Sequence, residues 1–109
     1  MTNNGSPVHT AEVVSPGMVL TVTQVCQSCK VDRVWISEMV SQGVLEPEGQ
    51  SETEWQFNAL HIRRIAIARR LERDFSLNAP GIALALQLLD EIEALRARLR
   101  SLEPARKGD

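Results

Sequence analysis

The side chains best suited to chemistry in this sequence are carboxylates, and they gather in two places. The segment GVLEPEGQSETEWQF, residues 43–57, contains four glutamates and no lysine or arginine: Glu46, Glu48, Glu52 and Glu54. A second acidic cluster occurs near the C-terminus, in helix-forming sequence: Asp90, Glu91 and Glu93. Grouped carboxylates attract cationic groups and repel phosphate. Both clusters are therefore candidate sites for a basic partner.

Two cysteines, Cys26 and Cys29, are the other reactive groups considered. A zinc site needs about four ligands, and the remaining soft ligands, His9 and His61, stand far from the pair in sequence. A redox pair needs a βαβ context, which is missing. Since free cysteine is among the most buried residue types, we expect both thiols to pack as small apolar groups on a short helix. We predict no metal site and no cofactor.

Enzyme chemistry is not expected. The carboxylates are scattered over faces predicted to be exposed, and no Ser-His-Asp set or glycine-rich phosphate loop is present. His61 stands beside Arg63 and Arg64 on a predicted helix, where a surface role is commoner than that of a base. We therefore predict no catalytic residues.

Length and charge restrict the remaining classes. The chain has 109 residues, enough for one small domain, and a formal net charge of -2. That charge gives no general attraction to nucleic acid or to an anionic membrane. No stretch approaches the roughly 18 apolar residues of a membrane span, and the N-terminus lacks the pattern of a signal peptide. We expect a cytoplasmic protein.

The chain is predicted to have four parts. Residues 1–18 form a flexible N-terminal arm, and residues 19–79 form a winged helix-turn-helix with a third helix. Residues 80–103 form one long helix, and residues 104–109 form a flexible tail. The fold class is mainly α, with a small two-stranded wing.

Capping residues predict where the elements begin and end. Val19 to Val22 forms a short strand or lead-in, and Thr23 caps a helix over 24–29. Asp32 caps a helix over 33–42, with Gly43 in the left-handed region at its end. Residues 44–46 and 53–57 form the wing strands. Asn58 caps a helix over 59–75, and Pro80 lies in the first turn of the last helix.

The helix over residues 59–75 is expected to have two faces. Its predicted core face comprises Leu60, Ile67, Ala68, Leu71 and Phe75. Its predicted basic face comprises Arg63, Arg69, Arg70 and Arg73. The basic face is either solvated or a docking surface for acidic groups.

The last helix carries two apolar stripes. Ile82, Leu86 and Leu89 suit packing onto the domain itself. A second stripe has the 4-3-4-3 spacing of a coiled-coil seam: Leu88, Ile92, Leu95, Leu99 and Leu102. Glu91, Arg96 and Arg98 flank it at g and e positions. We expect this seam to form a homodimer or to pair with another protein; the alternative is that the helix folds back along its own domain.

The helix-turn-helix has an unusual contact helix. DNA readers present basic and amide side chains there, whereas this helix offers Arg33 together with Glu38. An acidic wing beside it would repel the phosphate backbone that supplies most of the affinity. The scaffold is of a DNA-binding type, but its surface favours a protein partner.

Three stretches carry a family resemblance: GVLEPEG, EWQF and RLERDFSLNAPGIALALQLLDEIEALRARLRSLE. Over about Leu20 to Glu103 the chain resembles the chaperone-modulator (CbpM) family, a branch of the MerR-like winged helices. The resemblance implies binding to the J-domain of a DnaJ-like co-chaperone of the CbpA type. It implies that the chain lowers the stimulation of DnaK by that co-chaperone and can reduce its binding to DNA.

A J-domain engages DnaK through a basic helix and an adjoining loop, so one of the acidic clusters is expected to supply the electrostatic half of the site. The last helix is favoured because a rigid helix positions contacts better than a hairpin tip. The alternative function is a small MerR-like DNA-binding regulator, which would use Lys30, Arg33 and the basic face of the third helix.

Overall fold

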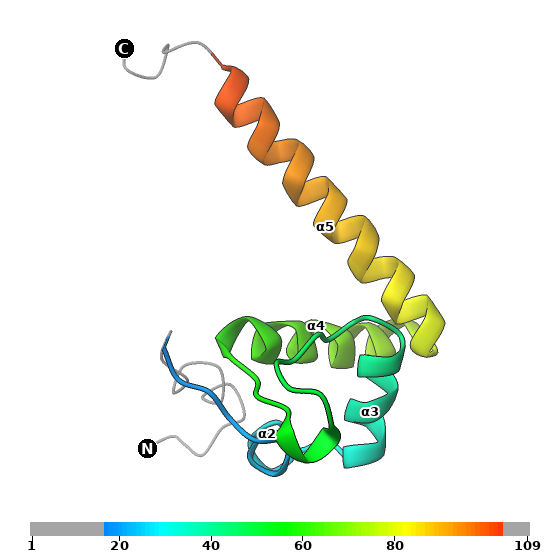
Figure 1. Cartoon of the computed structure of the whole chain (residues 1–109). Helices are drawn as coiled ribbons and strands as arrows, with labels where there is room; N and C mark the ends of the chain where they lie inside the picture. The colour runs from blue at the N-terminus through cyan, green and yellow to red at the C-terminus, as the bar shows by residue number, and fades with distance from the viewer. Residues whose placement is uncertain (1–16, 104–109) are drawn as a thin grey trace, which may run out of the picture.

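The computed structural model describes residues 17–103, and it is mainly α-helical, as predicted. It contains α2 (Val22–Cys29), α3 (Arg33–Ser41), the 3-10 turn η1 (Glu52–Glu54), α4 (Ala59–Phe75) and α5 (Ala79–Leu102). Figure 1 shows α2, α3 and α4 gathered into one body from which α5 projects. Most of the predicted arm (residues 1–18) and all of the predicted tail (residues 104–109) lie outside the described residues.

The helix-turn-helix begins two residues earlier than predicted. Thr21 caps α2, not Thr23: its Oγ1 accepts from the Gln24 N–H (3.2 Å), and the Gln24 side chain accepts from the Thr21 N–H (2.9 Å). This reciprocal capping box needs Ser or Thr three residues before Gln or Glu, a spacing that Thr23 does not offer. Asp32 precedes α3 as predicted, although its side chain makes no capping bond.

Gly43 ends α3 in the left-handed conformation, as predicted, with φ of 80°. The turn sends the next two amides back to the helix, because Val44 N–H and Leu45 N–H both donate to the Met39 carbonyl (2.9 and 3.3 Å). Both side chains are then buried in the core. Those amides are no longer available for a strand ladder.

The wing is less regular than the two strands that were expected. Among the described residues it is closed by a single pair of backbone hydrogen bonds, between Glu48 and Gln56 (3.2 and 2.9 Å). Residues 52–54 form η1 in place of strand, and Phe57 pairs instead with Leu20. Gly49 has φ of 108°, and a Cβ there would lie 2.5 Å from the Glu54 carbonyl oxygen. The wing is therefore a tight acidic loop.

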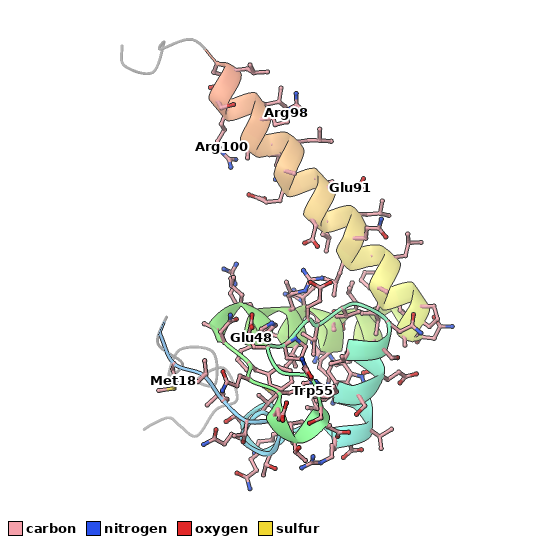
Figure 2. The ribbon with its side chains drawn as sticks, viewed as in Figure 1. Met18, Glu48, Trp55, Glu91, Arg98 and Arg100 are labelled. Atoms are coloured by element: carbon pink, nitrogen blue, oxygen red, sulfur yellow. The ribbon has the colours of Figure 1, made fainter. Side chains whose placement is uncertain are left out.

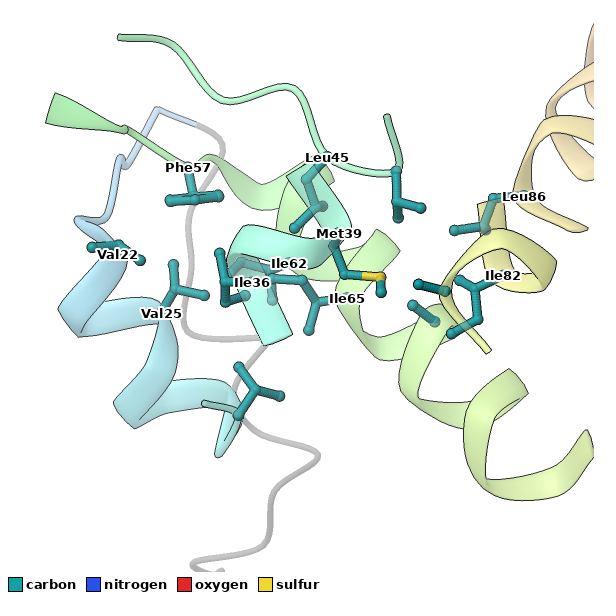
Figure 3. Packing of buried hydrophobic residues seen from close by; sticks show 14 residues of the cluster. Val22, Val25, Ile36, Met39, Leu45, Phe57, Ile62, Ile65, Ile82 and Leu86 are labelled. Atoms are coloured by element: carbon teal, nitrogen blue, oxygen red, sulfur yellow. The ribbon is translucent and has the colours of Figure 1, made fainter. Parts of the chain in front are cut away.

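One core joins the body to the base of α5. Phe57 is fully buried, and Trp55 meets its ring edge-on at 6.2 Å between centroids. Figure 3 shows Met39 between the Ile36–Ile65 region and the first turns of α5, where Ile82 and Leu86 lie. Ile82 and Leu86 are buried as predicted, whereas Leu89, which was expected to join them, is exposed. Every residue from Gln87 to Glu103 is exposed.

The predicted core face of α4 is wrong. Ile62, Ile65 and Ala68 are buried, whereas Leu60 (64% exposed) and Phe75 (67%) lie largely in solvent. Ile67 is also exposed, and Leu71 only partly packs against the core. The helix has apolar residues on two adjoining sides, and packing against α2 selects the isoleucine side. The cap at Asn58 is as predicted.

The arginines of α4 are exposed as predicted, and most are paired within the helix. Arg69 contacts Glu72 (3.1 Å), Arg70 contacts Asp74 (3.8 Å), and Arg73 contacts Asp74 (3.3 Å). Arg63 has no such partner among residues 17–103. No helix in that range combines the length and apolar composition required to cross a bilayer.

Two α4 substitutions separate the observed core face from the predicted one. Ile65→Ala should lower the free energy of unfolding by about 2–5 kcal/mol, because it leaves a cavity in the core. Leu60→Ala removes an exposed side chain and should cost less than about 1 kcal/mol. Urea denaturation of both variants measures the difference, and an equal loss would contradict the burial described above.

Candidate partner-binding groove

A groove lies where the loop after α3, the start of α4 and the middle of α5 meet. Its volume is about 320 Å³. The lining residues are Gly43, Val44, Glu46, Asn58, Leu60, His61, Arg64 and Asp90. One member of each predicted acidic cluster, Glu46 from the wing and Asp90 from the last helix, therefore lines the same groove.

Arg64 ties together the three segments that form the groove. Its Nε donates to the Val44 carbonyl (2.7 Å), and its Nη1 donates to both carboxylate oxygens of Asp90 (3.1 and 3.2 Å). The Arg64 side chain is largely covered, whereas that of Asp90 remains mostly exposed. A carboxylate has about four acceptor positions, so Asp90 keeps acceptor capacity toward the groove.

His61 fixes the wing backbone against α4. The Asn58 N–H donates to His61 Nδ1 (2.9 Å), so this ring nitrogen is an acceptor. The hydrogen of the neutral ring is then on Nε2, which donates to the Glu46 carbonyl (3.2 Å). Asn58 Oδ1 in turn accepts from the His61 N–H (3.1 Å), which completes a capping box. His61 is a structural residue that holds Glu46 at the rim.

The other acidic residues of the wing point to different surroundings. Glu52 forms an ion pair with Arg33 of α3 (3.5 Å). Glu54 accepts from the Gln50 N–H (3.3 Å), inside the loop. Glu48 is exposed, and Figure 2 shows it on the wing loop near α4. Within the described part of the chain, the carboxylates of Glu46 and Glu48 have no hydrogen-bond or ion-pair partner.

The acidic residues of α5 divide between two sides of the helix. Asp90 faces α4, and Glu93, one turn further on, pairs with Arg100 (3.7 Å). Glu91 lies on another side, beside the coiled-coil stripe. Figure 2 shows Glu91 and Arg98 on one side of α5 and Arg100 on the opposite side. The structure thus brings Asp90 and Glu93 together with the groove and separates Glu91 from it.

The coiled-coil stripe contacts no other part of the described chain. Its five members, Leu88, Ile92, Leu95, Leu99 and Leu102, are between 45% and 73% exposed. The helix that carries them extends away from the body (Figure 1), so the alternative that it folds back along its own domain is wrong.

The two thiols lie half-buried on α2 and pack against the core, as expected. Desolvation, with a smaller contribution from Cys26, raises the pKa of Cys29 to about 11. Burial likewise raises the pKa of Cys26. Raised pKa values keep both groups in the unreactive thiol form at neutral pH. No group of three or more candidate metal ligands occurs within residues 17–103.

Sequence reasoning missed three groove residues. Arg64 was treated only as a neighbour of His61, and Leu60 was assigned to the core. A usable signal existed for His61, since an Asn followed three residues later by a side chain that can accept a hydrogen bond is the spacing of a capping box. No local pattern indicates that Arg64 reaches Asp90, 26 residues away.

Replacing Arg64 tests its role as the link between these segments. Arg64→Met should lower the free energy of unfolding by about 1–3 kcal/mol, because the Val44 carbonyl and Asp90 lose their charged donor. Arg63→Met, one position earlier and without a partner, should change it by less than about 0.5 kcal/mol. Urea denaturation of the pair measures both effects, and equal values would contradict the assignment.

Comparison with known proteins identifies the family. Residues 20–104 match the family model described as MerR HTH family regulatory protein. The chain is 42% identical over 91 residues to the chaperone modulatory protein CbpM of Coxiella burnetii (strain Dugway 5J108-111), covering 84% of this chain and 86% of that protein.

Two further relatives carry the same name. The CbpM protein of Salmonella paratyphi A (strain ATCC 9150 / SARB42) is 36% identical over 85 residues, covering 78% of this chain and 84% of that protein. The CbpM protein of Pseudomonas entomophila (strain L48) is 35% identical over 78 residues, covering 72% and 77%. Neither the family description nor these names denote an enzyme. The chain belongs to the CbpM family of chaperone modulatory proteins, and its helix-turn-helix is of the MerR type.

Proposed function

We propose that this chain binds the J-domain of a CbpA-type co-chaperone and blocks its access to DnaK. The observation that carries the proposal is the groove, in which Glu46 and Asp90 present carboxylates next to the exposed apolar side chain of Leu60. The names of the relatives, which denote chaperone modulation, support the same conclusion.

The groove suits a basic side chain on a helix surface. The aliphatic stem of a lysine or arginine can cover Leu60 while its cationic end approaches Glu46 or Asp90. A J-domain engages DnaK through its basic helix, so occupying that helix would prevent the stimulation of DnaK. The acidic rim also answers why a MerR-type fold has an acidic wing: the charge that repels DNA attracts a basic protein.

A second candidate, DNA binding, is favoured by the match to MerR regulatory proteins. Arg33, the one basic residue of α3, is held by Glu52 and donates to Thr23 Oγ1 (3.1 Å). Asp32 and Glu38 are exposed at the two ends of the same helix. This face would therefore bring acidic groups to the phosphates, which makes DNA the less favourable partner.

We also propose that the chain is a homodimer that pairs through the coiled-coil stripe of α5. Five large aliphatic side chains on one side of a projecting helix lose contact with water only when another helix covers them. The groove residues Asp90 and Glu93 lie on a different side of α5. Pairing and J-domain binding are therefore compatible.

Neutralising the groove should weaken J-domain binding. Glu46→Gln is expected to raise the dissociation constant for a purified CbpA-type J-domain by roughly three- to tenfold and to reduce its salt dependence. Glu38→Gln, an exposed carboxylate on α3, is the matched control and should leave binding unchanged. Isothermal titration at two salt concentrations measures both, and Asp90→Asn provides an independent second variant.

Unchanged binding for Glu46→Gln and Asp90→Asn would place the interaction elsewhere. A loss caused by Glu38→Gln would point to the helix-turn-helix face instead. In parallel, the wild-type chain should lower J-domain-stimulated ATP hydrolysis by DnaK.

Duplex DNA should bind weakly or not at all. Mobility-shift titrations with mixed-sequence duplexes are expected to show no complex at moderate salt, because the exposed carboxylates of α3 and the wing face the phosphates. A tight complex whose affinity falls steeply with added salt would instead support the regulator function.

A further inference from the structure

The stripe of α5 lies on the side of the helix opposite its buried contacts. Ile82 and Leu86 face the body, whereas Leu88, Ile92 and Leu95 face away from it. Beyond Leu86 no side chain of α5 is buried, yet the helix continues to Leu102. Helices in proteins gain most of their stability from packing an apolar face, so this part of α5 needs a partner.

The residues of the stripe specify the kind of partner. With Leu88, Leu95 and Leu102 at d positions, Ile92 and Leu99 occupy a positions. A β-branched residue at a with leucine at d favours two-stranded parallel coiled coils. The seam is therefore composed for pairing with a like helix in the same direction.

We propose that α5 pairs with α5 of a second copy as a parallel, in-register coiled coil. This inference rests on the homodimer proposed above and is independent of J-domain binding. The arguments for parallel pairing are the composition of the seam and the residues on its two edges.

The edges of the stripe are complementary to themselves in parallel register. In a parallel pair, a residue at g faces the e residue five positions later on the other helix. Leu84 then faces Leu89 of the second copy, and both are large exposed apolar residues. Glu91 faces Arg96 of the second copy. Arg98 faces Glu103 of the second copy, so every edge pair is matched.

Antiparallel pairing matches fewer residues. In that direction g residues face g residues and e residues face e residues. In the register that places Ile92 against Leu95 of the second copy, Glu91 faces Arg98 favourably, but Arg96 faces Leu89. Arg96 and Arg98 have no ion-pair partner within the described part of their own chain, so the parallel pair uses both charges and the antiparallel pair uses one.

The polar residues on the inner side of α5 do not compete for these contacts. Glu93 and Arg100 pair with one another at 3.7 Å and lie away from the stripe. Asp90 is bonded to Arg64. The charges of Glu91, Arg96 and Arg98 are thus available for another helix.

Two double variants of identical composition test the direction. Glu91→Arg alone reverses the charge facing Arg96 in parallel register and facing Arg98 in antiparallel register. It should weaken dimerisation about tenfold in either case. The rescue then distinguishes the directions: Glu91→Arg with Arg96→Glu restores parallel pairs, whereas Glu91→Arg with Arg98→Glu restores antiparallel pairs.

Sedimentation equilibrium of the full chain at low salt gives the dissociation constants. The proposal predicts that the variant with Arg96→Glu returns to within about threefold of the wild-type value, and that the variant with Arg98→Glu is at least as weak as Glu91→Arg. Rescue by Arg98→Glu, or by neither, overturns the parallel arrangement. A wild-type chain that stays monomeric overturns both the dimer and its direction. Circular dichroism checks that each variant keeps its helices.

Discussion

The geometry of the candidate site depends on one guanidinium group. Arg64 holds the Val44 carbonyl at 2.7 Å and the Asp90 carboxylate at 3.1 and 3.2 Å. These bonds join the loop after α3, the third helix and the last helix at one point. The burial of Ile82 and Leu86 fixes the first turns of α5, and Arg64 extends that attachment by one turn. Without it, Glu46 and Asp90 would belong to surfaces that move separately.

This attachment leaves two sides of α5 with different tasks. The side toward the body carries Asp90 and Glu93 and borders the groove proposed for the J-domain. The opposite side carries the stripe proposed for pairing with a second copy. Because the two sets do not share residues, a dimer would present two grooves without sacrificing either surface. A fold of the DNA-reading type would thereby gain a protein-binding role through surface charge and a longer last helix.

The sequence predicts the elements better than it predicts their faces. Asn58, Gly43 and Pro80 act locally, through capping bonds and backbone dihedrals, and their roles follow from residue type and spacing. The buried side of α4 does not follow, because both Ile65 and Leu60 belong to apolar sides of the same helix. Contacts with α2, α3 and α5 decide between them. The cap at Thr21 was predictable from its spacing to Gln24.

The candidate site was only half accessible in the same way. The acidic residues were evident from composition, but whether Glu46 and Asp90 lie together depends on contacts between residues far apart in sequence. The wing strands failed for a related reason: the Val44 and Leu45 amides bond to Met39 and cannot form a ladder. Conversely, the α5 stripe was recognisable because a heptad spacing is a local property.

The central claim is that a J-domain occupies the groove and not the helix-turn-helix face. Methyl resonances report this directly, since Leu60 is exposed in the groove and Val34 is 77% exposed on α3. In a titration of the labelled chain with a CbpA-type J-domain, the account predicts that the Leu60 methyl signals shift and those of Val34 stay in place. Shifts at Val34 with no change at Leu60 would contradict it.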